Sequence, residues 1–348
     1  MKKSIILGML MLGCGGKAFD LGHTESEPQG FADLPEADGD AGGAEPQTLY
    51  RSTTELVSAF TLDETNVYAI ITHADSYELI SCPIERCRTE RTTLYSAPYP
   101  HPPGNGYLNL IVVGETLFWT TDEYLVASCS KHGCDQPLVT NSVVQVLAGD
   151  DEYAYWLDGA NFMRLAPGSA TPELVRRDEA HLFGGPLYVS TSSVYFTSVR
   201  SDGIYRMAKD GQTDAELFAS DQDIADISVN RDALFYTSNI LTGRVVRCEL
   251  DDCGAGTSRV AAVQRWPSEV HATESELFWL NEVTSSSRGT KGSLASCALP
   301  ACDSVRQWGL DFTIESSSPK LNSVAVNDRY VVYVESVENG SVLRAVSR

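Results

Sequence analysis

A short apolar and aromatic motif recurs seven times along this sequence, and its spacing restricts the possible fold more than any other feature. Successive copies begin 50, 37, 40, 40, 43 and 54 residues apart, and each follows a β-branched segment and a polar turn. Runs of about five residues rich in Val, Ile, Tyr, Phe and Trp, bounded by Gly, Asp, Asn and Ser, are typical of β-strands. The copies start at Val67 (VYAI), Leu117 (LFWT), Ala154 (AYWL), Val194 (VYFT), Leu234 (LFYT), Leu277 (LFWL) and Val331 (VVYV).

Residues 188–220 show one complete repeat, in which four short strand-like segments are separated by polar turns. Four-stranded units of about 40 residues are typical of β-propeller blades, whose second strand is packed between neighbouring sheets. We therefore predict an all-β fold, a seven-bladed β-propeller with four-stranded antiparallel blades. Trp119, Trp156 and Trp279 lie in three of the motifs and are expected to be packing residues. No segment shows a helical period.

The two ends of the repeat region complement each other. The seventh repeat reaches Arg348 after only three strands. Residues 46–52 (PQTLYRS) precede the first complete repeat and match a fourth strand, residues 91–97 (RTTLYSA). We therefore expect the N-terminal strand to complete the last blade and close the ring, which favours seven blades over six or eight.

One stretch resembles a known type of propeller repeat. Residues 205–211 (YRMAKDG) are similar to the strand and turn of YWTD-type and related bacterial propeller repeats. The match covers the fourth blade well and the other blades loosely. The resemblance implies the propeller fold and leaves the ligand open.

Eight of the nine cysteines form four C-x4-C pairs, each placed where the fourth blade has its KDG turn between strands three and four. Residues that flank a tight hairpin bring their Cβ atoms within disulfide range, and an exported protein meets oxidising conditions. The alternative is zinc, but pairs on separate blades lie too far apart to share an ion. We therefore predict disulfides, with no metal and no cofactor. The predicted disulfides join Cys82 to Cys87, Cys129 to Cys134, Cys248 to Cys253 and Cys297 to Cys302.

The N-terminus has the features of a bacterial export signal. Two lysines precede the apolar residues 4–12, a stretch too short to span a bilayer as a helix, which needs about 20 residues. Residues 10–14 (LMLGC) resemble the lipobox of bacterial lipoproteins. The resemblance implies cleavage before Cys14, acylation of this residue and, because Gly15 follows, an outer-membrane location in a Gram-negative envelope. An ordinary secretory signal with a chance cysteine is the alternative.

The chain divides into three expected parts: a signal peptide (1–13), the lipidated cysteine with an acidic tether (14–46) and the propeller (47–348). Residues 15–46 contain eight carboxylates and one lysine. Such a composition favours a flexible coil, and 32 residues of it span about 30 Å on average. The formal net charge of the chain is −21, which repels nucleic acid and anionic lipid heads. We therefore predict membrane contact through the N-terminal lipid and no nucleic-acid partner.

Strand order assigns the loops to two faces. The turns between strands one and two and between strands three and four share one face, here called the bottom face, with all four cysteine pairs. The loops between strands two and three and the connections between blades share the opposite, top face. The tether is expected to reach blade seven on the bottom face, so that the top face points away from the membrane.

The top face carries the longer and less regular loops, residues 96–107, 176–185, 280–292 and 309–320. Variable loops on a rigid scaffold are where binding function commonly resides. We therefore regard polar and aromatic residues of this face as candidate binding residues. They are His73, Asp75, Tyr99, His101, Asp122, Asp158, His181, Arg200, Trp266 and Glu282.

The sequence contains no recognisable catalytic motif: no nucleophile elbow, zinc-protease helix motif, phosphate loop or EF-hand loop. The nearest approach to a carboxylate cluster, Asp221, Asp223 and Asp226, suits an ordinary connection between blades. These observations favour a membrane-anchored, non-catalytic binding or scaffolding module with a protein or glycan partner. The alternative is a propeller enzyme acting on an envelope or extracellular polysaccharide or ester, because propeller sites draw residues from several blades.

Overall fold

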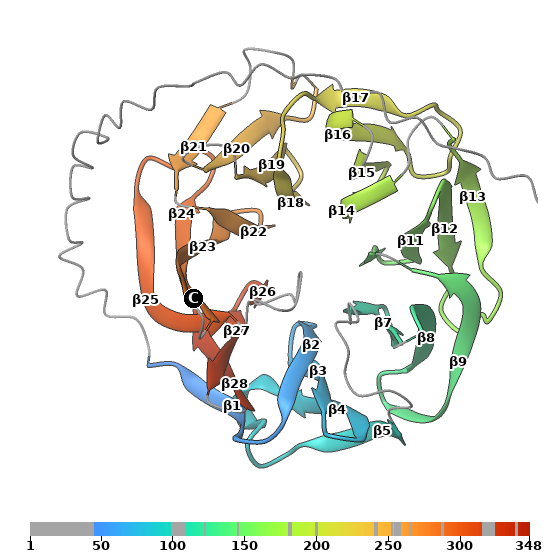
Figure 1. The fold of residues 1–348 in the computed structure, drawn as a ribbon, viewed down its shortest axis with the longest axis vertical. Helices are drawn as coiled ribbons and strands as arrows, with labels where there is room; N and C mark the ends of the chain where they lie inside the picture. Colours follow the sequence, from blue (N-terminus) through green and yellow to red (C-terminus); the bar gives the residue numbers. More distant parts are fainter. Residues whose placement is uncertain are drawn as a thin grey trace, which may run out of the picture. The chain divides into compact units, whose positions relative to one another are not determined.

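The computed structural model arranges the strands in seven four-stranded antiparallel sheets around a common axis (Figure 1). It describes residues 45–98, 109–121, 123–144, 146–179, 183–198, 201–239, 243–251, 253, 259–264, 266–286, 289–314, 324–337 and 340–348. All of these residues belong to one compact unit, Asp40–Arg348. The predicted seven-bladed propeller is confirmed, and the described residues contain a single helical turn, η1 (Ile84–Arg86).

Each blade begins at the axis and runs outward strand by strand (Figure 1). The first four blades are β2 (Leu56–Leu62), β3 (Asn66–Thr72), β4 (Ser76–Pro83), β5 (Thr92–Pro98); β6 (Leu110–Val113), β7 (Thr116–Thr120), β8 (Leu125–Ser130), β9 (Gly133–Val143); β10 (Leu147–Gly149), β11 (Ala154–Asp158), β12 (Asn161–Leu165), β13 (Glu173–Arg177); and β14 (Phe183–Val189), β15 (Ser193–Ser198), β16 (Ser201–Ala208), β17 (Glu216–Ala219). The last three are β18 (Ile224–Val229), β19 (Ala233–Ser238), β20 (Arg244–Glu249), β21 (Arg259–Val263); β22 (Pro267–Ala272), β23 (Glu276–Ser286), β24 (Gly289–Ala298), β25 (Val305–Ile314); and β26 (Val324–Val326), β27 (Tyr330–Val337), β28 (Gly340–Ser347), β1 (Gln47–Ser52).

The recurring motif forms the second strand of every blade. Apolar side chains from these strands pack between neighbouring sheets and make seven apolar clusters. Trp119, Trp156 and Trp279 are fully buried there, as expected. A strand buried on both faces needs apolar residues at successive positions, which explains why these segments do not alternate between apolar and polar.

The ring is closed by the N-terminal strand, as the sequence predicts. β1 pairs antiparallel with β28, from Gln47 opposite Ala345 to Ser52 opposite Ser341. Its side chains Leu49 and Tyr50 are buried in the cluster between blades seven and one. The last blade is therefore built from both ends of the propeller sequence.

All four expected top-face loops include strand residues: β5 reaches Pro98, β13 ends at Arg177 and β14 begins at Phe183, and the other two loops are strand over a larger part of their length. Residues 280–292 extend the hairpin of β23 and β24, with Asn281 paired to Ser293 and Ser286 to Gly289. Likewise β25 continues to Ile314, inside the segment 309–320 that we expected to be a loop. The Ser- and Gly-rich composition misled the prediction, because strand pairing uses backbone groups that all residues carry.

All four predicted disulfides are present, each in a turn between strands three and four on the bottom face. The Cα–Cα distances are 4.7 Å between Cys82 and Cys87, 5.5 Å between Cys129 and Cys134, 5.0 Å between Cys248 and Cys253, and 5.0 Å between Cys297 and Cys302. These separations lie in the range usual for disulfides. The side chains of Cys82 and Cys87 are buried in the cluster between blades seven and one, and Cys134 is buried in the cluster between blades one and two. These disulfides therefore close the turns and also extend the apolar core towards the bottom face.

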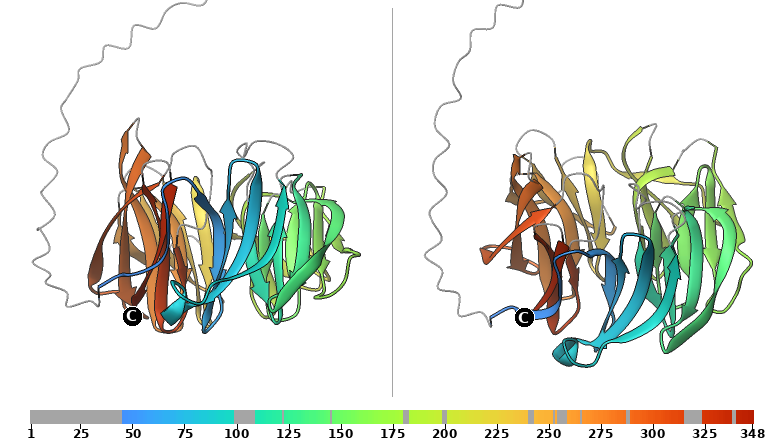
Figure 2. Two further views of the ribbon diagram at one scale, coloured as in Figure 1. Left: turned by 90° about the horizontal axis from the view of Figure 1, so that it is seen from below. Right: turned by 60° about the horizontal axis from the view of Figure 1, so that its bottom comes forward.

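The chain also enters the propeller on the bottom face. Gln47 lies opposite Ala345, near the end of β28, and donates a hydrogen bond to the Glu85 carbonyl (3.0 Å). Figure 2 shows the start of β1 and the C-terminus on the same side of the ring. Within the described residues no helix is long and apolar enough to cross a bilayer.

Candidate functional site

The turns between strands one and two share one hydrogen-bonding pattern in six of the seven blades. The side-chain oxygen of the first turn residue accepts a hydrogen bond from the backbone N–H three residues later, at 2.8 to 3.0 Å. Asn, Asp, Ser and Thr favour such turns because they replace a backbone acceptor with their own. The first residues are Asp63, Asp150, Ser190, Asn230, Thr273 and Asn327. The bottom face is therefore a ring of similarly fixed turns.

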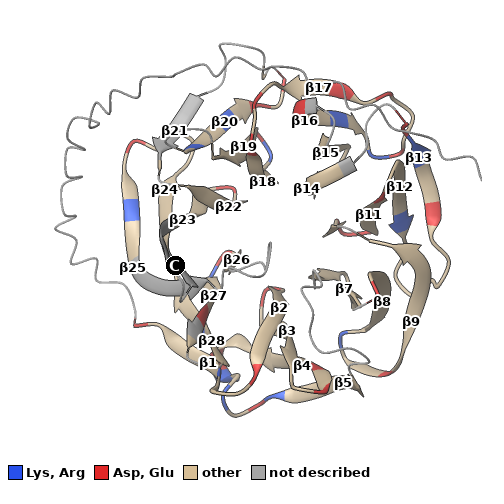
Figure 3. Ribbon diagram, viewed as in Figure 1, with Lys and Arg blue, Asp and Glu red and all other residues tan. Residues whose placement is uncertain are grey.

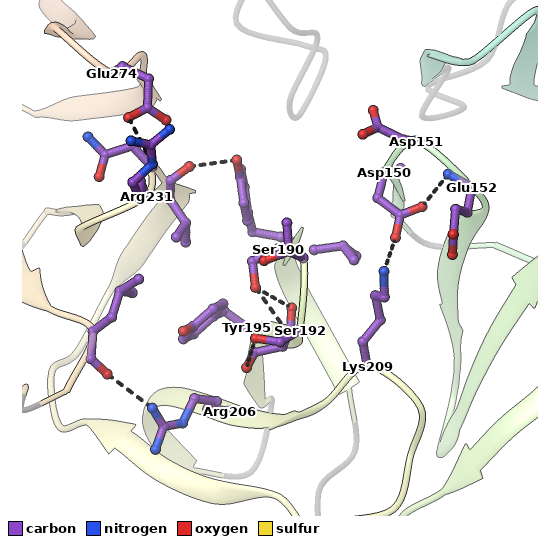
Figure 4. A pocket seen from close by; sticks show the side chains of 18 of the residues that line it. Asp150, Asp151, Glu152, Ser190, Ser192, Tyr195, Arg206, Lys209, Arg231 and Glu274 are labelled. Carbon is purple, nitrogen blue, oxygen red and sulfur yellow. Dashed lines mark hydrogen bonds and ion pairs between the residues drawn. The ribbon is translucent and has the colours of Figure 1, made fainter.

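A cavity of about 1160 Å³ opens on the bottom face, between the turns of blades three to six (Figure 4). A second cavity of about 630 Å³ is lined by turns of blades five, six, seven and one. Both are lined by Tyr188, Val229, Asn230 and Glu274, so they adjoin. The Tyr188 hydroxyl donates to the Val229 carbonyl (2.7 Å) and fixes the wall that they share.

The basic side chains of the larger cavity are engaged by acceptors. The Lys209 ammonium lies 2.7 Å from an Asp150 carboxylate oxygen, and the Arg206 guanidinium donates to the Leu250 carbonyl (3.1 Å) as well as to Glu216. Arg231 lies 4.0 Å from Glu274. Figure 3 shows Asp and Glu residues in red beside β11 and β22, two strands next to this cavity.

Three exposed carboxylates of the cavity, those of Asp151, Glu152 and Asp251, make no side-chain hydrogen bond or ion pair with the described residues. Asp150 is different, because burial opposes its ionisation while Lys209 and the N–H groups of Glu152 and Tyr153 more than offset that effect and lower its pKa. The cavity therefore offers three free carboxylates to a ligand, whereas its Lys209 and Arg206 side chains are already bonded within the protein.

The described lining contains hydroxyl groups, but no hydrogen bond given by the structure joins one of them to a carboxylate or an imidazole. Ser190 donates to the Ser193 carbonyl (3.0 Å), and the Ser192 and Ser193 hydroxyls lie 3.4 Å apart. No His or Cys belongs to the described lining of either cavity. A nucleophilic hydroxyl requires an adjacent general base. The arrangement can bind a polar ligand through charge and hydrogen bonds.

A second polar cluster lies on the inner strands of blades five and six. Asp226 on β18 accepts a hydrogen bond from the Val270 N–H (3.0 Å), and Glu269 on β22 accepts one from the Val324 N–H (3.2 Å). His271, two residues after Glu269, places Nε2 3.7 Å from the Glu269 carboxylate. Burial opposes protonation of His271, but Glu269 and Asp226 more than offset this and raise its pKa.

Four of the candidate residues predicted from the sequence have described side chains, and they lie apart. His73 pairs with Glu55 (3.1 Å), and Asp75 is exposed in the same turn of blade one. Asp158 of blade three accepts a hydrogen bond from Ser142 of blade two (3.2 Å). Trp266 is 48% exposed where blades five and six join. No hydrogen bond or ion pair joins any two of these four in the described part of the chain.

The other predicted positions are not described in full. Glu282 belongs to β23, but its side chain lies outside the described part. The remaining residues lie outside the described ranges altogether; they are Cys14, Tyr99, His101, Asp122, His181 and Arg200.

Both polar sites escaped the sequence reasoning. Asp226 lies within a strand, away from Asp221, which is 4% exposed and bonded to Tyr236 and Arg244 (2.8 and 2.6 Å). Two sequence features could have indicated the cavity: the polar turn repeated between strands one and two, and Lys209 of the KDG turn. The described residues contain no group of three or more His, Cys, Asp or Glu side chains that could hold a metal ion.

No protein-family model and no curated protein matches this chain. Solved propellers do resemble it. A catalytically inactive virginiamycin B lyase from Staphylococcus aureus, crystallised with quinupristin, is 10% identical with a TM-score of 0.58, over 87% of this chain and 98% of that one. BamB from Moraxella catarrhalis is 11% identical with a TM-score of 0.53, over 85% and 87%. A chain of a nidogen/laminin complex is 15% identical with a TM-score of 0.50, over 73% and 95%. At these identities the likeness concerns the fold.

Proposed function

We propose that this protein is a non-catalytic binding module of a bacterial cell envelope, and that it engages a polar segment of a partner protein in the bottom-face cavity. The observation that carries the proposal is the cavity itself. It has about 1160 Å³ of space, walls fixed by hydrogen-bonded turns, three carboxylates without a partner among the described residues, and no nucleophile–base pair in its described lining. Polar groups presented from rigid walls are what a recognition site needs.

The anchor is the second part of the proposal. The lipobox-like residues 10–14 support lipid attachment at Cys14, and Gly15 after it supports an outer-membrane location. A coil of about 30 Å would then join the lipid to the bottom face at Gln47 and leave space there for a partner. Replacing Cys14 by Ser should abolish incorporation of a labelled fatty acid and release the protein from membranes. Unchanged labelling would contradict the anchor.

The similar structures are compatible with this function but do not decide it. The same fold occurs in a chain of a nidogen/laminin complex and in a lyase crystallised with quinupristin. A fold shared by binding proteins and enzymes leaves the argument to the site. The top-face residues singled out from the sequence, Tyr99 and His101 among them, are proposed as a further contact surface.

Site-directed photo-crosslinking tests the cavity. A photoreactive amino acid in place of Glu152 should capture a partner protein from envelopes, whereas the same amino acid in place of Glu123, on the top face, should not. Combining Asp151→Asn, Glu152→Gln and Asp251→Asn should reduce recovery of the captured protein at least tenfold. The matched control is Asp202→Asn, Glu123→Gln and Asp223→Asn, which removes the same charge from the top face at exposed residues outside the candidate set. Equal recovery with both triple variants would refute the cavity as the binding site.

The cluster of Asp226, Glu269 and His271 favours a second candidate, an enzyme that cleaves a polysaccharide or an ester. A histidine whose pKa is raised by two carboxylates can serve as a general acid near neutral pH. Turnover of such a substrate by the purified protein, lost in His271→Ala and kept in the cavity triple variant, would establish the enzyme.

A further inference from the structure

Two aromatic residues on the top face combine an exposed ring with a left-handed backbone. Trp266, where blades five and six connect, is 48% exposed at φ +47°. Tyr124, in the loop between β7 and β8 of blade two, is 40% exposed at φ +60°. No other described aromatic residue reaches this exposure, and only two further non-glycine residues, Asp223 and Cys302, have positive φ in the described part.

Both features cost the folded state energy. A left-handed backbone is unfavourable for residues with a Cβ, and bulky side chains adopt it rarely. An aromatic ring in water forgoes the burial that Trp119, Trp156 and Trp279 obtain. Strain of this kind persists where the surroundings enforce it, and it concentrates at ligand-binding positions.

The surroundings of Trp266 do enforce its position. A Cβ on Gly243 would lie 2.5 Å from the Pro267 Cδ atom and 2.9 Å from the Trp266 nitrogen, so only glycine allows this close approach. The Gln264 N–H donates to the Gly243 carbonyl (3.1 Å). In blade two, the backbone of Tyr124 is held in a similar way. Its carbonyl accepts a hydrogen bond from the Val144 N–H (2.7 Å), and the Tyr124 N–H donates to the Thr121 carbonyl.

Two amide side chains, those of Gln264 and Asn281, lie beside the Trp266 segment in the described part of the chain. The Asn281 amide nitrogen donates to the Gln264 side-chain oxygen (2.8 Å), and Asn281 lies opposite Pro267 in the sheet. The Asn281 Oδ1 atom is buried and has no hydrogen-bond partner. An aromatic ring beside amide groups can recognise a ligand that has an apolar face and hydroxyl groups at its edge.

We propose that Trp266 and Tyr124 are stacking platforms on the top face for an extended, uncharged glycan. This inference rests on the proposed binding function and adds a ligand class on the face opposite the cavity. The two rings belong to blades on different sides of the axis, with β7 and β22 across the ring from each other (Figure 1), so a chain of sugar units suits them better than a monosaccharide. The net charge of −21 disfavours an anionic polysaccharide.

Tryptophan fluorescence provides a direct test. The purified protein is titrated with neutral oligomers of glucose and of N-acetylglucosamine, and retention on the corresponding insoluble polysaccharides is measured. One of these glycans should shift the emission of Trp266, because Trp119, Trp156 and Trp279 are fully buried, and the shift should persist in Trp308→Phe, which removes the one other tryptophan, a partly buried one. Trp266→Ala should weaken binding at least tenfold, Tyr124→Ala should weaken it less, and Trp266→Phe should retain most of it. The control Trp308→Phe, at a partly buried ring, should leave affinity unchanged.

Trp266→Gly separates a binding role from a structural one. Glycine relieves the left-handed backbone, so the melting temperature should rise by about 2 °C while glycan binding is lost. A fall in melting temperature would assign Trp266 to the fold and overturn the proposal. Binding of none of these glycans, or capture of a protein that depends on Trp266, would overturn it too. The cavity triple variant should bind glycan normally, so failure here and failure of the cavity proposal are distinguishable.

Discussion

The two faces of this propeller are built differently. On the bottom face the chain reverses through side-chain-capped turns and four disulfides, and its positive-φ residues in the described part are glycines apart from Cys302. On the top face four glycines also have positive φ, but three residues with large or charged side chains, Tyr124, Asp223 and Trp266, take the left-handed conformation beside them. The difference indicates that turn chemistry on the bottom face stabilises the ring, whereas the top face retains local strain. Four predictions examine this contrast, from the largest effect to the smallest.

Removing a capping carboxylate from the bottom face should lower the free energy of unfolding far more than removing an exposed carboxylate from the top face. Asp63 accepts hydrogen bonds from Thr65 N–H (3.0 Å), Asn66 N–H (2.8 Å) and Tyr68 hydroxyl (2.8 Å), and it pairs with Lys131 of the next blade (3.3 Å). Asp63→Ala leaves these donors without an acceptor and should lower the free energy of unfolding by about 3 kcal/mol. Asp75→Ala, in an exposed top-face turn, should change it by less than about 0.5 kcal/mol. Urea denaturation measures both, and equal losses would contradict the contrast.

Removing one disulfide should cost less and should also alter the cavity. Leu250 and Asp251 line the cavity and lie inside the loop that the disulfide between Cys248 and Cys253 closes. Replacing both cysteines by Ala should lower the free energy of unfolding by about 2 kcal/mol on the chain-entropy model. It should also weaken partner capture, with glycan binding on the top face as the unaffected control. A double variant as stable as the parent would show that this disulfide does not stabilise the bottom face.

His271 on the inner strand β22 should make the free energy of unfolding fall as the pH rises through the pKa of this side chain. The pKa of His271 is raised above its ordinary value of 6.5 when the protein folds, since Glu269 and Asp226 outweigh the effect of burial. Its contribution to stability is therefore complete below about pH 6.5 and is lost as the pH rises through the folded-state pKa. Melting temperatures between pH 5.5 and 9 should show this loss, and His271→Gln should remove it. A variant with the same alkaline slope as the parent would exclude His271.

The smallest expected effect concerns a residue that has positive φ but no aromatic side chain. Asp223 is exposed at φ +50°, so Asp223→Gly should raise the free energy of unfolding by about 1 kcal/mol. On the bottom face Gly114 has φ +56°, and Gly114→Ala should lower it by about 1 kcal/mol. Changes of the same sign in these two variants would show that backbone strain does not distinguish the faces.

The fold could be predicted because every blade repeats the same short sequence pattern. The motif at Val194 reads as a strand buried on both faces, and the cysteine pairs mark the turns between strands three and four. The missing fourth strand of blade seven identified residues 46–52 as its replacement. All of these signals lie within short segments, so no knowledge of distant contacts was needed.

The sites could not be predicted in the same way, because their residues become neighbours only through the ring. Asp226 and His271 are 45 positions apart and meet because inner strands of adjacent blades lie side by side. The cavity joins turns of four blades, each of which reads alone as an ordinary reversal. Trp266 was selected for its residue type, but its left-handed backbone follows from contact with Gly243, which the sequence does not reveal.

The closure of the ring by β1 has a mechanical consequence. β1 starts on the bottom face at Gln47 and runs antiparallel to β28 up to Ser52. A force that pulls the chain away from the bottom face therefore acts along the strand and loads its hydrogen bonds in shear, all at once. A pull at right angles to the strand would instead open them one after another. If the chain is held by a lipid at its N-terminus, this geometry lets the propeller resist drag on whatever it binds without first releasing its own closing strand.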